Sequence, residues 1–115
     1  MHIVVNCTAN LNKPRDWPQD IQWCRYDVNN NMWPQWRILH ENAITPLVGG
    51  SNVLVHCKAG CHRAGATAVL MVAFIRRMSI DDAFEIVRRQ RGIIGIRHNV
   101  AELRRVLAWS QDHPM

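Results

Sequence analysis

One short unit constrains the fold of this chain more than any other part of its sequence. Residues 53–55 form an apolar strand, residues 56–63 a loop rich in polar and reactive side chains, and residues 64–75 a long apolar run. A run that is apolar on almost every side is typical of a helix packed against a sheet. The unit therefore predicts a buried strand that feeds, through the loop, into a buried helix.

Two more strands are expected before this unit, at residues 3–5 and 21–28, and three asparagines end the second. Further helices are expected at residues 34–47, after a capping box that begins at Ser79, and after Asn99. Pro46 and the glycines at 49–50 are the expected end of the first of these. Alternating strands and helices predict a compact α/β fold with a mostly parallel central sheet flanked by helices.

Composition and charge limit the classes of protein to which this chain can belong. A chain of 115 residues with 48% hydrophobic composition has room for one domain, expected over residues 1–115. A net charge of +5 favours anionic partners. The longest apolar run, residues 66–75, is well short of the roughly 20 residues that cross a bilayer. Four unevenly spaced cysteines do not form a secreted disulfide framework. We expect a soluble, intracellular (cytoplasmic) protein without a membrane span.

The loop contains several residues that could bind a metal or haem, and two such interpretations are disfavoured. His56, Cys57, Cys61 and His62 are capable zinc ligands, but the paired spacing and downstream pair of structural zinc sites are missing. The run from Cys57 to His62 differs from a haem attachment pattern by one inserted residue. We therefore expect neither a metal nor another cofactor.

A third interpretation uses the position of the loop between strand and helix. Backbone N–H groups of the loop and the positive end of the following helix converge on one point, which makes an anion cradle. Arg63 offers a planar fork that binds phosphate oxygens in pairs. The same cradle favours the thiolate form of Cys57, which then acts as a nucleophile toward phosphorus. A buried, inert thiol is the alternative for Cys57.

The pattern His56-Cys57-x-x-Gly60-x-x-Arg63 resembles the signature loop of the cysteine-dependent protein tyrosine phosphatases, and specifically their dual-specificity branch. The segments "VVNCTANL", "VLVHCKAG" and "RRMSIDDAFEIVRRQR" extend the resemblance over nearly the whole chain. It implies that a cysteine attacks phosphorus, an arginine holds the phosphate oxygens, and an aspartate from another loop protonates the leaving oxygen. No metal takes part in that chemistry.

Carried over to this chain, the resemblance makes Cys57 the nucleophile and Arg63 the phosphate clamp, with His56 orienting the loop. The expected phosphate-binding residues are His56, Lys58, Ala59, Gly60, Cys61, His62 and Arg63. Lys58 and His62 also add positive charge at the rim. Because similar basic residues occur in family branches that act on phosphoinositides or inositol phosphates, such a substrate remains an alternative.

The general acid is expected at Asp27, which lies 30 residues before Cys57 and follows a strand. Two alternatives stay open. The loop can place Asn29 or Asn30 where the acid should be, and an amide cannot donate a proton usefully. Asp27 can also be a structural residue that ends the strand.

The chain departs from the family pattern in two further ways. Ala64 occupies a position where the family usually has a hydroxyl that helps the cysteine leave, so we expect a slow second step. The family domain normally begins with two more strands and a helix, so we expect this chain to be either a natural minimal version or a fragment. An uncovered sheet edge can promote pairing with a second copy, so a monomer or a weak homodimer is expected. Cys7 and Cys61 are candidate redox partners of Cys57 by resemblance, against the alternative of Cys7 as a core residue.

The sequence thus predicts a phosphatase that acts on phosphotyrosine, phosphoserine and phosphothreonine of proteins through a phosphocysteine intermediate. One rival is a phosphopeptide-binding pseudophosphatase with little turnover, and a phosphoinositide or inositol phosphate phosphatase is another. Nucleic acid is not an expected partner, because the arginines of the C-terminal third are not interleaved with aromatic residues.

Overall fold

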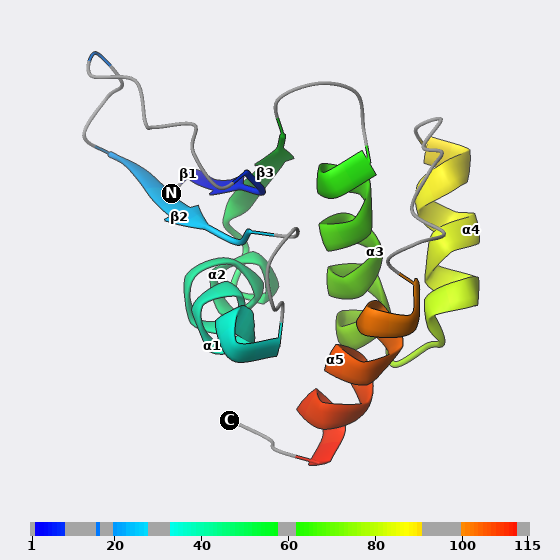
Figure 1. Ribbon diagram of the computed structural model, residues 1–115. Helices are drawn as coiled ribbons and strands as arrows, with labels where there is room; N and C mark the ends of the chain where they lie inside the picture. Colours follow the sequence, from blue (N-terminus) through cyan, green and yellow to red (C-terminus); the bar gives the residue numbers. More distant parts are fainter. Residues whose placement is uncertain are drawn as a thin grey trace.

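Three parallel strands form the sheet of this fold, which a computed structural model describes for residues 2–8, 16, 20–27, 33–57, 62–90 and 100–112. The strands are β1 (His2–Asn6), β2 (Ile21–Arg25) and β3 (Asn52–His56), and β1 lies between the other two. Asn6 at the end of β1 is in register with Arg25 and His56. The all-parallel pairing confirms the predicted sheet, and Figure 1 shows the helices arranged around it.

The helices begin and end close to the expected residues. They are α1 (Trp36–Leu39), α2 (Thr45–Val48), α3 (His62–Arg76), α4 (Ile80–Gln90) and α5 (Val100–Asp112). A short 3-10 helix, η1 (Trp33–Gln35), precedes α1, and a π-helical turn, η2 (His40–Ile44), joins α1 to α2. None of the helices in the described part of the chain is long and apolar enough to cross a membrane.

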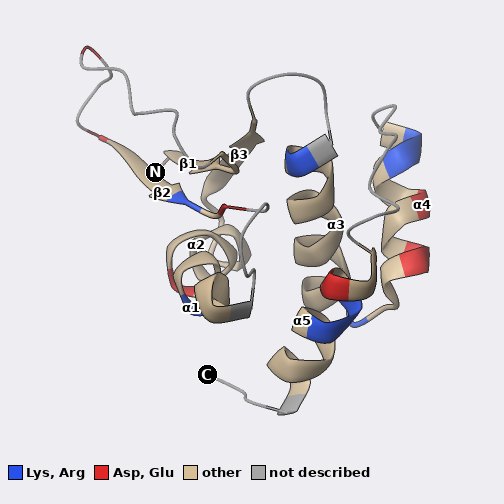
Figure 2. Ribbon diagram, viewed as in Figure 1, with Lys and Arg blue, Asp and Glu red and all other residues tan. Residues whose placement is uncertain are grey.

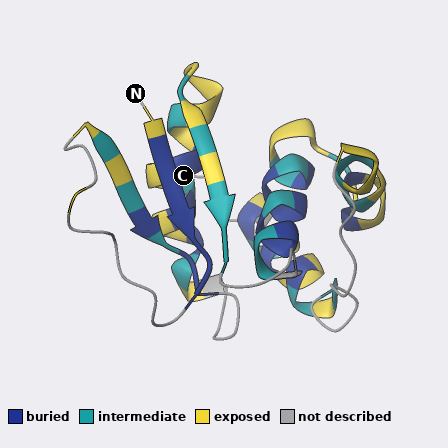
Figure 3. Ribbon diagram, turned by 90° about the horizontal axis from the view of Figure 1, so that it is seen from above, coloured by how far each residue is buried: buried dark blue, intermediate teal, exposed yellow. Residues whose placement is uncertain are grey.

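One hydrophobic core lies between a face of the sheet and the helices. Strand β1 is the best buried of the three, as Figure 3 shows. The core is built from strand residues and from α1, α3, α4 and α5, and its fully buried members include Val5, Trp36, Leu39, Val69, Leu70, Leu103 and Val106. The helix α3, predicted from its apolar run, is thus confirmed as the helix buried against the sheet.

The expectation that residues 53–55 form a buried strand is wrong at Leu54. Val53 and Val55 pack against the core, but Leu54 is 57% exposed. Side chains alternate between the two faces of a strand, so Leu54 points away from the helices that cover its neighbours. Strand β3 also lies at one side of the described sheet, with β1 as its pairing partner.

The helical segment of residues 33–48 continues past Pro46, which was expected to help end it. Proline clashes with the carbonyl four residues earlier in a regular α-helix. Here the backbone passes through the π-helical turn η2 first, and Pro46 then lies in the first turn of α2, where a missing N–H is tolerated. The segment ends at the expected glycines, with Gly50 at a φ of 103°.

The start of α4 is also as expected. The Ser79 hydroxyl accepts a hydrogen bond from the backbone N–H of Asp82 at 3.1 Å. That bond satisfies one of the free N–H groups of the first turn, which is the contribution of an N-cap serine. The predicted second strand is shorter than expected, because β2 ends at Arg25 and leaves Tyr26 and Asp27 beyond it.

Candidate functional site

The candidate site lies at the C-terminal edge of the sheet, where all three parallel strands end. Backbone pairing continues one residue beyond the strands: Cys7 N–H donates to the carbonyl of His56, and Tyr26 N–H donates to the carbonyl of Asn6, both at 2.9 Å. Cys57, the residue after β3, is therefore placed beside Cys7, the residue after β1. The predicted nucleophile thus lies at the edge where α/β folds carry their sites.

Cys57 is half-buried and packs against the hydrophobic core. A reactive cysteine needs partial access to solvent, which a fully buried thiol lacks. His56, the last residue of β3, is also half-buried, and its carbonyl is the acceptor for Cys7 N–H. The described geometry of these two residues is compatible with the roles expected from the sequence.

Arg63 lies in the first turn of α3 and is half-buried. Figure 2 shows that this turn is basic and that it is the end of the helix reached from β3. The partial positive charge of a helix N-terminus and the charge of Arg63 therefore act in the same place. Lys58, Ala59, Gly60, Cys61 and the side chain of His62 lie outside the described residues, so their expected phosphate contacts remain predictions.

Cys7, the residue after β1, contacts α3 through a hydrogen bond to Thr67. It is fully buried, and its thiol donates a hydrogen bond to the hydroxyl of Thr67 at 3.2 Å. Burial raises the pKa of the Cys7 thiol to about 12; the Thr67 bond and the charge of Arg63 oppose the shift, whereas Cys57 adds to it. Cys7 is thus close enough to Cys57 and Arg63 for all three to interact electrostatically.

Three cysteines are free thiols in the described residues: Cys7, Cys24 and Cys57. A redox link between Cys7 and Cys57 remains a prediction, and Cys61 lies outside the described residues. No group of three His, Cys, Asp or Glu side chains within the described ranges lies close enough together to hold a metal ion.

The segment after β1 is fixed by a local polar network. The side-chain oxygen of Asn6 accepts hydrogen bonds from the N–H of Thr8 at 2.9 Å and from its hydroxyl at 2.7 Å. Arg25 then donates to the carbonyl of Thr8 at 2.6 Å. Asn6 and Thr8 are both buried, so these bonds satisfy polar groups that would otherwise be costly to bury.

Asp27, the predicted general acid, lies two residues beyond the end of β2 and is 6% exposed. Its backbone is held by the side chain of Gln35, which accepts from the Asp27 N–H at 2.7 Å and donates to the Asp27 carbonyl at 2.9 Å. No local sequence pattern points to Gln35, because its two hydrogen bonds to Asp27 depend on the folded position of η1. Asn29 and Asn30, the alternatives to Asp27, lie outside the described residues.

A cavity of about 580 Å³ lies at the other end of α3 and is not the candidate site. Its lining includes Phe74, Ile75 and Arg77, whereas Arg63 lies in the first turn of the same helix. A rise of about 1.5 Å per residue separates the two ends of this helix by roughly 15–20 Å. The predicted phosphate-binding residues therefore define the candidate site, and the cavity is separate from it.

Comparison with known proteins gives sequence relatives, although no family model matches the chain. It is 35% identical over 60 residues to tyrosine phosphatase 123R of Invertebrate iridescent virus 6, a match covering 48% of this chain and 42% of that protein. It is 40% identical over 45 residues to dual specificity protein phosphatase 2 of Homo sapiens, covering 39% of this chain and 14% of that protein. The chain thus matches less than half the length of either relative.

Solved structures share the fold over almost the whole chain. A mouse dual-specificity phosphatase complexed with zinc tungstate has a TM-score of 0.78 at 20% identity, covering 97% of this chain and 72% of that one. Human DUSP28 has a TM-score of 0.76 at 18% identity, covering 95% of this chain and 76% of that one. Sequence relatives and fold neighbours agree, and they confirm the resemblance to dual-specificity phosphatases.

Proposed function

We propose that this chain, a relative of the dual-specificity phosphatases by sequence and by fold, hydrolyses phosphotyrosine and phosphoserine or phosphothreonine esters of proteins through a phosphocysteine intermediate. One observation carries the proposal: Cys57 directly follows β3 and Arg63 lies in the first turn of α3, and the buried Cys7 interacts electrostatically with both. A thiol that attacks phosphorus and a guanidinium that stabilises the phosphate charge, both near the N-terminus of a helix, are the two groups that this chemistry requires.

In the first step the Cys57 thiolate attacks phosphorus and forms an S–P bond. The P–O bond to the substrate oxygen breaks, and that oxygen takes a proton from the Asp27 carboxylic acid and leaves as an alcohol or phenol. Arg63 binds two of the phosphate oxygens and stabilises the charge that develops on them. Asp27 lies beyond the end of β2, at the same edge of the sheet where Cys57 follows β3, and this position is compatible with the role.

In the second step water attacks the phosphorus of the phosphocysteine. The Asp27 carboxylate accepts a proton from that water, the S–P bond breaks, and Cys57 returns to the thiolate as inorganic phosphate forms. Ala64, the second residue after the start of α3, offers no hydroxyl to the departing sulfur. The second step is therefore the slow one, and phosphocysteine accumulates.

Protein phosphoesters are the preferred substrate class because the relatives are named tyrosine and dual-specificity phosphatases. The mouse fold neighbour was crystallised with tungstate, an oxyanion similar to phosphate, which supports an oxyanion as the ligand of this fold. A cytoplasmic location and a monomer or weak homodimer complete the proposal.

Turnover on three substrates, measured side by side, tests it: an aryl phosphate, a set of phosphopeptides, and a phosphoinositide. We expect phosphate release from the first two, inhibition by vanadate, and loss of all turnover in Cys57→Ser. Tight phosphopeptide binding without phosphate release would establish the pseudophosphatase instead. Turnover of the phosphoinositide well above that of the phosphopeptides would establish the lipid alternative.

A further inference from the structure

The backbone at Asp27 is held by one side chain that bonds to both its N–H and its carbonyl. Gln35 accepts from the N–H through Oε1 and donates to the carbonyl through Nε2, at 2.7 Å and 2.9 Å. This pair of bonds reproduces the pairing that a neighbouring strand would give. Only an Asn or Gln side chain carries an acceptor and a donor side by side in this way, so the contact is specific to the residue type.

Gln35 is itself attached to a rigid part of the molecule. It is the last residue of η1, and the next residue, Trp36, is 1% exposed in the core. The Trp36 ring packs edge-on against Phe74 of α3, with centroids 4.8 Å apart. Because Gln35 is attached to the buried Trp36, its side chain holds the backbone N–H and carbonyl of Asp27 in place.

The other side of the Asp27 segment is tied to the sheet. The N–H of Tyr26 donates to the carbonyl of Asn6 at 2.9 Å, which extends the pairing of β2 with β1. The residue before Asp27 is thus hydrogen-bonded to β1, and Asp27 itself is held by the two hydrogen bonds from Gln35. The residue cannot shift along the edge of the sheet without breaking one of these contacts.

We propose that Gln35 is a positioning residue that holds the general acid Asp27 at the reach required for proton transfer. The inference rests on the proposed function, since it assigns Gln35 a part in the same reaction. An acid must come within hydrogen-bond distance of the leaving oxygen, and misplacement by about 1 Å can cost about 10²-fold in rate. Gln35 acts through the Asp27 backbone and touches neither substrate nor phosphate.

A purely structural role for Gln35 makes a different prediction from a positioning role. Loss of fold stability lowers kcat/KM for every substrate alike. A displaced acid lowers kcat/KM, which reports cleavage of the P–O bond, only when the leaving group needs a proton. The test therefore compares 2,4-dinitrophenyl phosphate, whose phenolate leaves unaided, with phenyl phosphate, whose leaving oxygen requires an acid.

Two variants remove the contact in different ways. Gln35→Leu keeps the size and deletes both hydrogen bonds. Gln35→Glu keeps an acceptor for the Asp27 N–H but places an oxygen against the Asp27 carbonyl. We expect kcat/KM, which reports cleavage of the P–O bond in the first step, to fall about tenfold or more on phenyl phosphate in each variant, up to the 10²–10⁴-fold that acid catalysis contributes. On the dinitrophenyl ester kcat/KM should fall less than about twofold.

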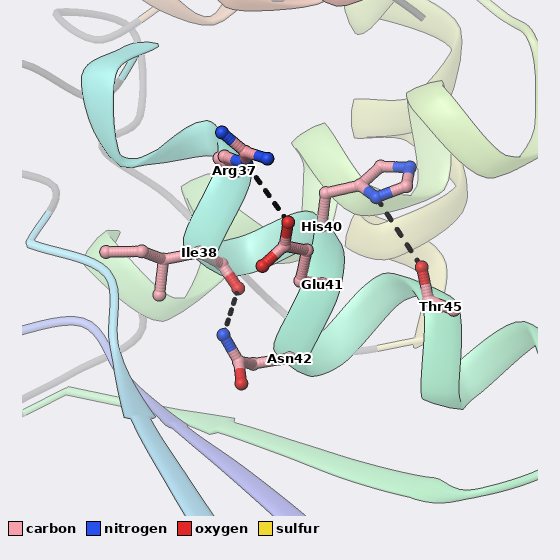
Figure 4. Close-up of polar contacts among 6 residues, drawn as sticks. All are labelled: Arg37, Ile38, His40, Glu41, Asn42 and Thr45. Carbon is pink, nitrogen blue, oxygen red and sulfur yellow. Dashed lines mark hydrogen bonds and ion pairs between the residues drawn. The ribbon is translucent and has the colours of Figure 1, made fainter. Parts of the chain in front are cut away.

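The matched control is Asn42→Ala. Asn42 lies in the π-helical turn of the same helical segment, is exposed, and donates its side-chain bond to the carbonyl of Ile38 at 2.9 Å, as Figure 4 shows. The substitution Asn42→Ala removes a side-chain amide from this segment without affecting Asp27, so both substrates should keep their wild-type rates.

Asp27→Asn and the double variant complete the experiment. Because Gln35 acts only through Asp27, we expect Gln35→Leu to have no further effect on phenyl phosphate in the Asp27→Asn background. An equal loss on both esters, or full additivity with Asp27→Asn, would overturn the positioning role. If Asp27→Asn has no effect on phenyl phosphate, Asp27 is not the general acid, and the positioning role of Gln35 is overturned as well. Failure of the proposed phosphatase function gives a different result: turnover of dinitrophenyl phosphate would survive in Cys57→Ser.

Discussion

The two sides of the candidate site are built in different ways. The nucleophile side, residues 56–64, is one continuous stretch that joins the end of β3 to the first turn of α3. The acid side is assembled from three separate stretches: Asn6 at the end of β1, Tyr26 and Asp27 after β2, and Gln35 in η1. The nucleophile side is therefore encoded by local spacing, whereas the acid side exists only in the folded chain.

This difference has a chemical counterpart. Attack on phosphorus and charge stabilisation are needed for every phosphate ester, so changes in the nucleophile side affect all substrates. Proton donation is needed in proportion to the basicity of the leaving oxygen, so changes in the acid side affect substrates unequally. Leaving-group dependence thus assigns a residue to one side or the other.

The largest expected effect breaks the acid side. Asp27→Asn removes the carboxylic acid but keeps the size and a polar side chain at a position that is 6% exposed. We expect kcat/KM on an alkyl or phenyl phosphate, which reports the first step, to fall by about 10²–10⁴-fold. Steady-state rates over a range of substrate concentrations measure it.

Asp20→Asn is the matched control, because Asp20 is exposed and lies just before β2. It makes the same chemical change on the opposite end of the same strand. Wild-type rates are expected for it. If Asp27→Asn retains the wild-type kcat/KM on these esters, Asp27 is a structural residue beyond the end of β2 and the acid lies elsewhere.

The sequence predicted the nucleophile side because its parts follow one another along the chain. The parallel sheet, the helix α3 and the placement of Cys57 and Arg63 at a strand end and a helix start all follow from local apolar patterns. The exposure of Leu54 could not be predicted, since an apolar run in a parallel strand looks the same at an edge as in the centre.

The features that could not be predicted are contacts between separate segments of the chain. Gln35 lies eight residues from Asp27, and Thr67 lies 60 residues from Cys7. Neither residue type has a local pattern that names its partner, because the bond forms only once the sheet has brought the segments together. The π-helical turn η2, which joins α1 to α2 before Pro46, likewise has no local pattern that predicts it.

A smaller effect is expected at Cys7, which lies between the two sides. Its pKa is raised by burial from 9.0 to about 12, so its thiol stays neutral in the fold under conditions where the unfolded chain ionises. Its contribution to stability is therefore complete below about pH 9 and is lost as the pH rises toward 12. At pH 10 the ionisation favours the unfolded state by about 1.4 kcal/mol.

Cys7→Ser isolates this contribution, because serine keeps a donor for Thr67 and does not ionise in this range. We expect the variant to be less stable than the wild type at pH 7 and the gap to narrow by about 1.4 kcal/mol at pH 10. Urea unfolding at the two pH values measures it. Cys24 and Tyr26, whose pKa values burial also raises, contribute equally to both proteins and cancel in the difference. A gap that stays constant would show that Cys7 ionises alike in the folded and unfolded chain.

The smallest expected effect sharpens the nucleophile side. Ala64 follows Arg63 in the first turn of α3 and is half-buried, so Ala64→Ser places a hydroxyl in the same turn as the phosphate clamp. A hydrogen bond to the departing sulfur is worth about 1 kcal/mol, which predicts about a fivefold faster second step. Stopped-flow release of a nitrophenol from wild-type protein should show a burst followed by a slower phase, and the variant should lose part of the burst as its steady rate rises.

Ala68→Ser provides the control, since Ala68 is also half-buried and lies one turn further along α3. The same substitution there adds a hydroxyl to the helix at a greater distance from Cys57, so the burst should remain. The step that Ala64→Ser accelerates follows departure of the leaving group, so the gain should be equal for esters with good and poor leaving groups. A gain confined to poor leaving groups would mean that the hydroxyl assists the acid side, and a linear release from time zero in the wild type would show that the second step is not slow.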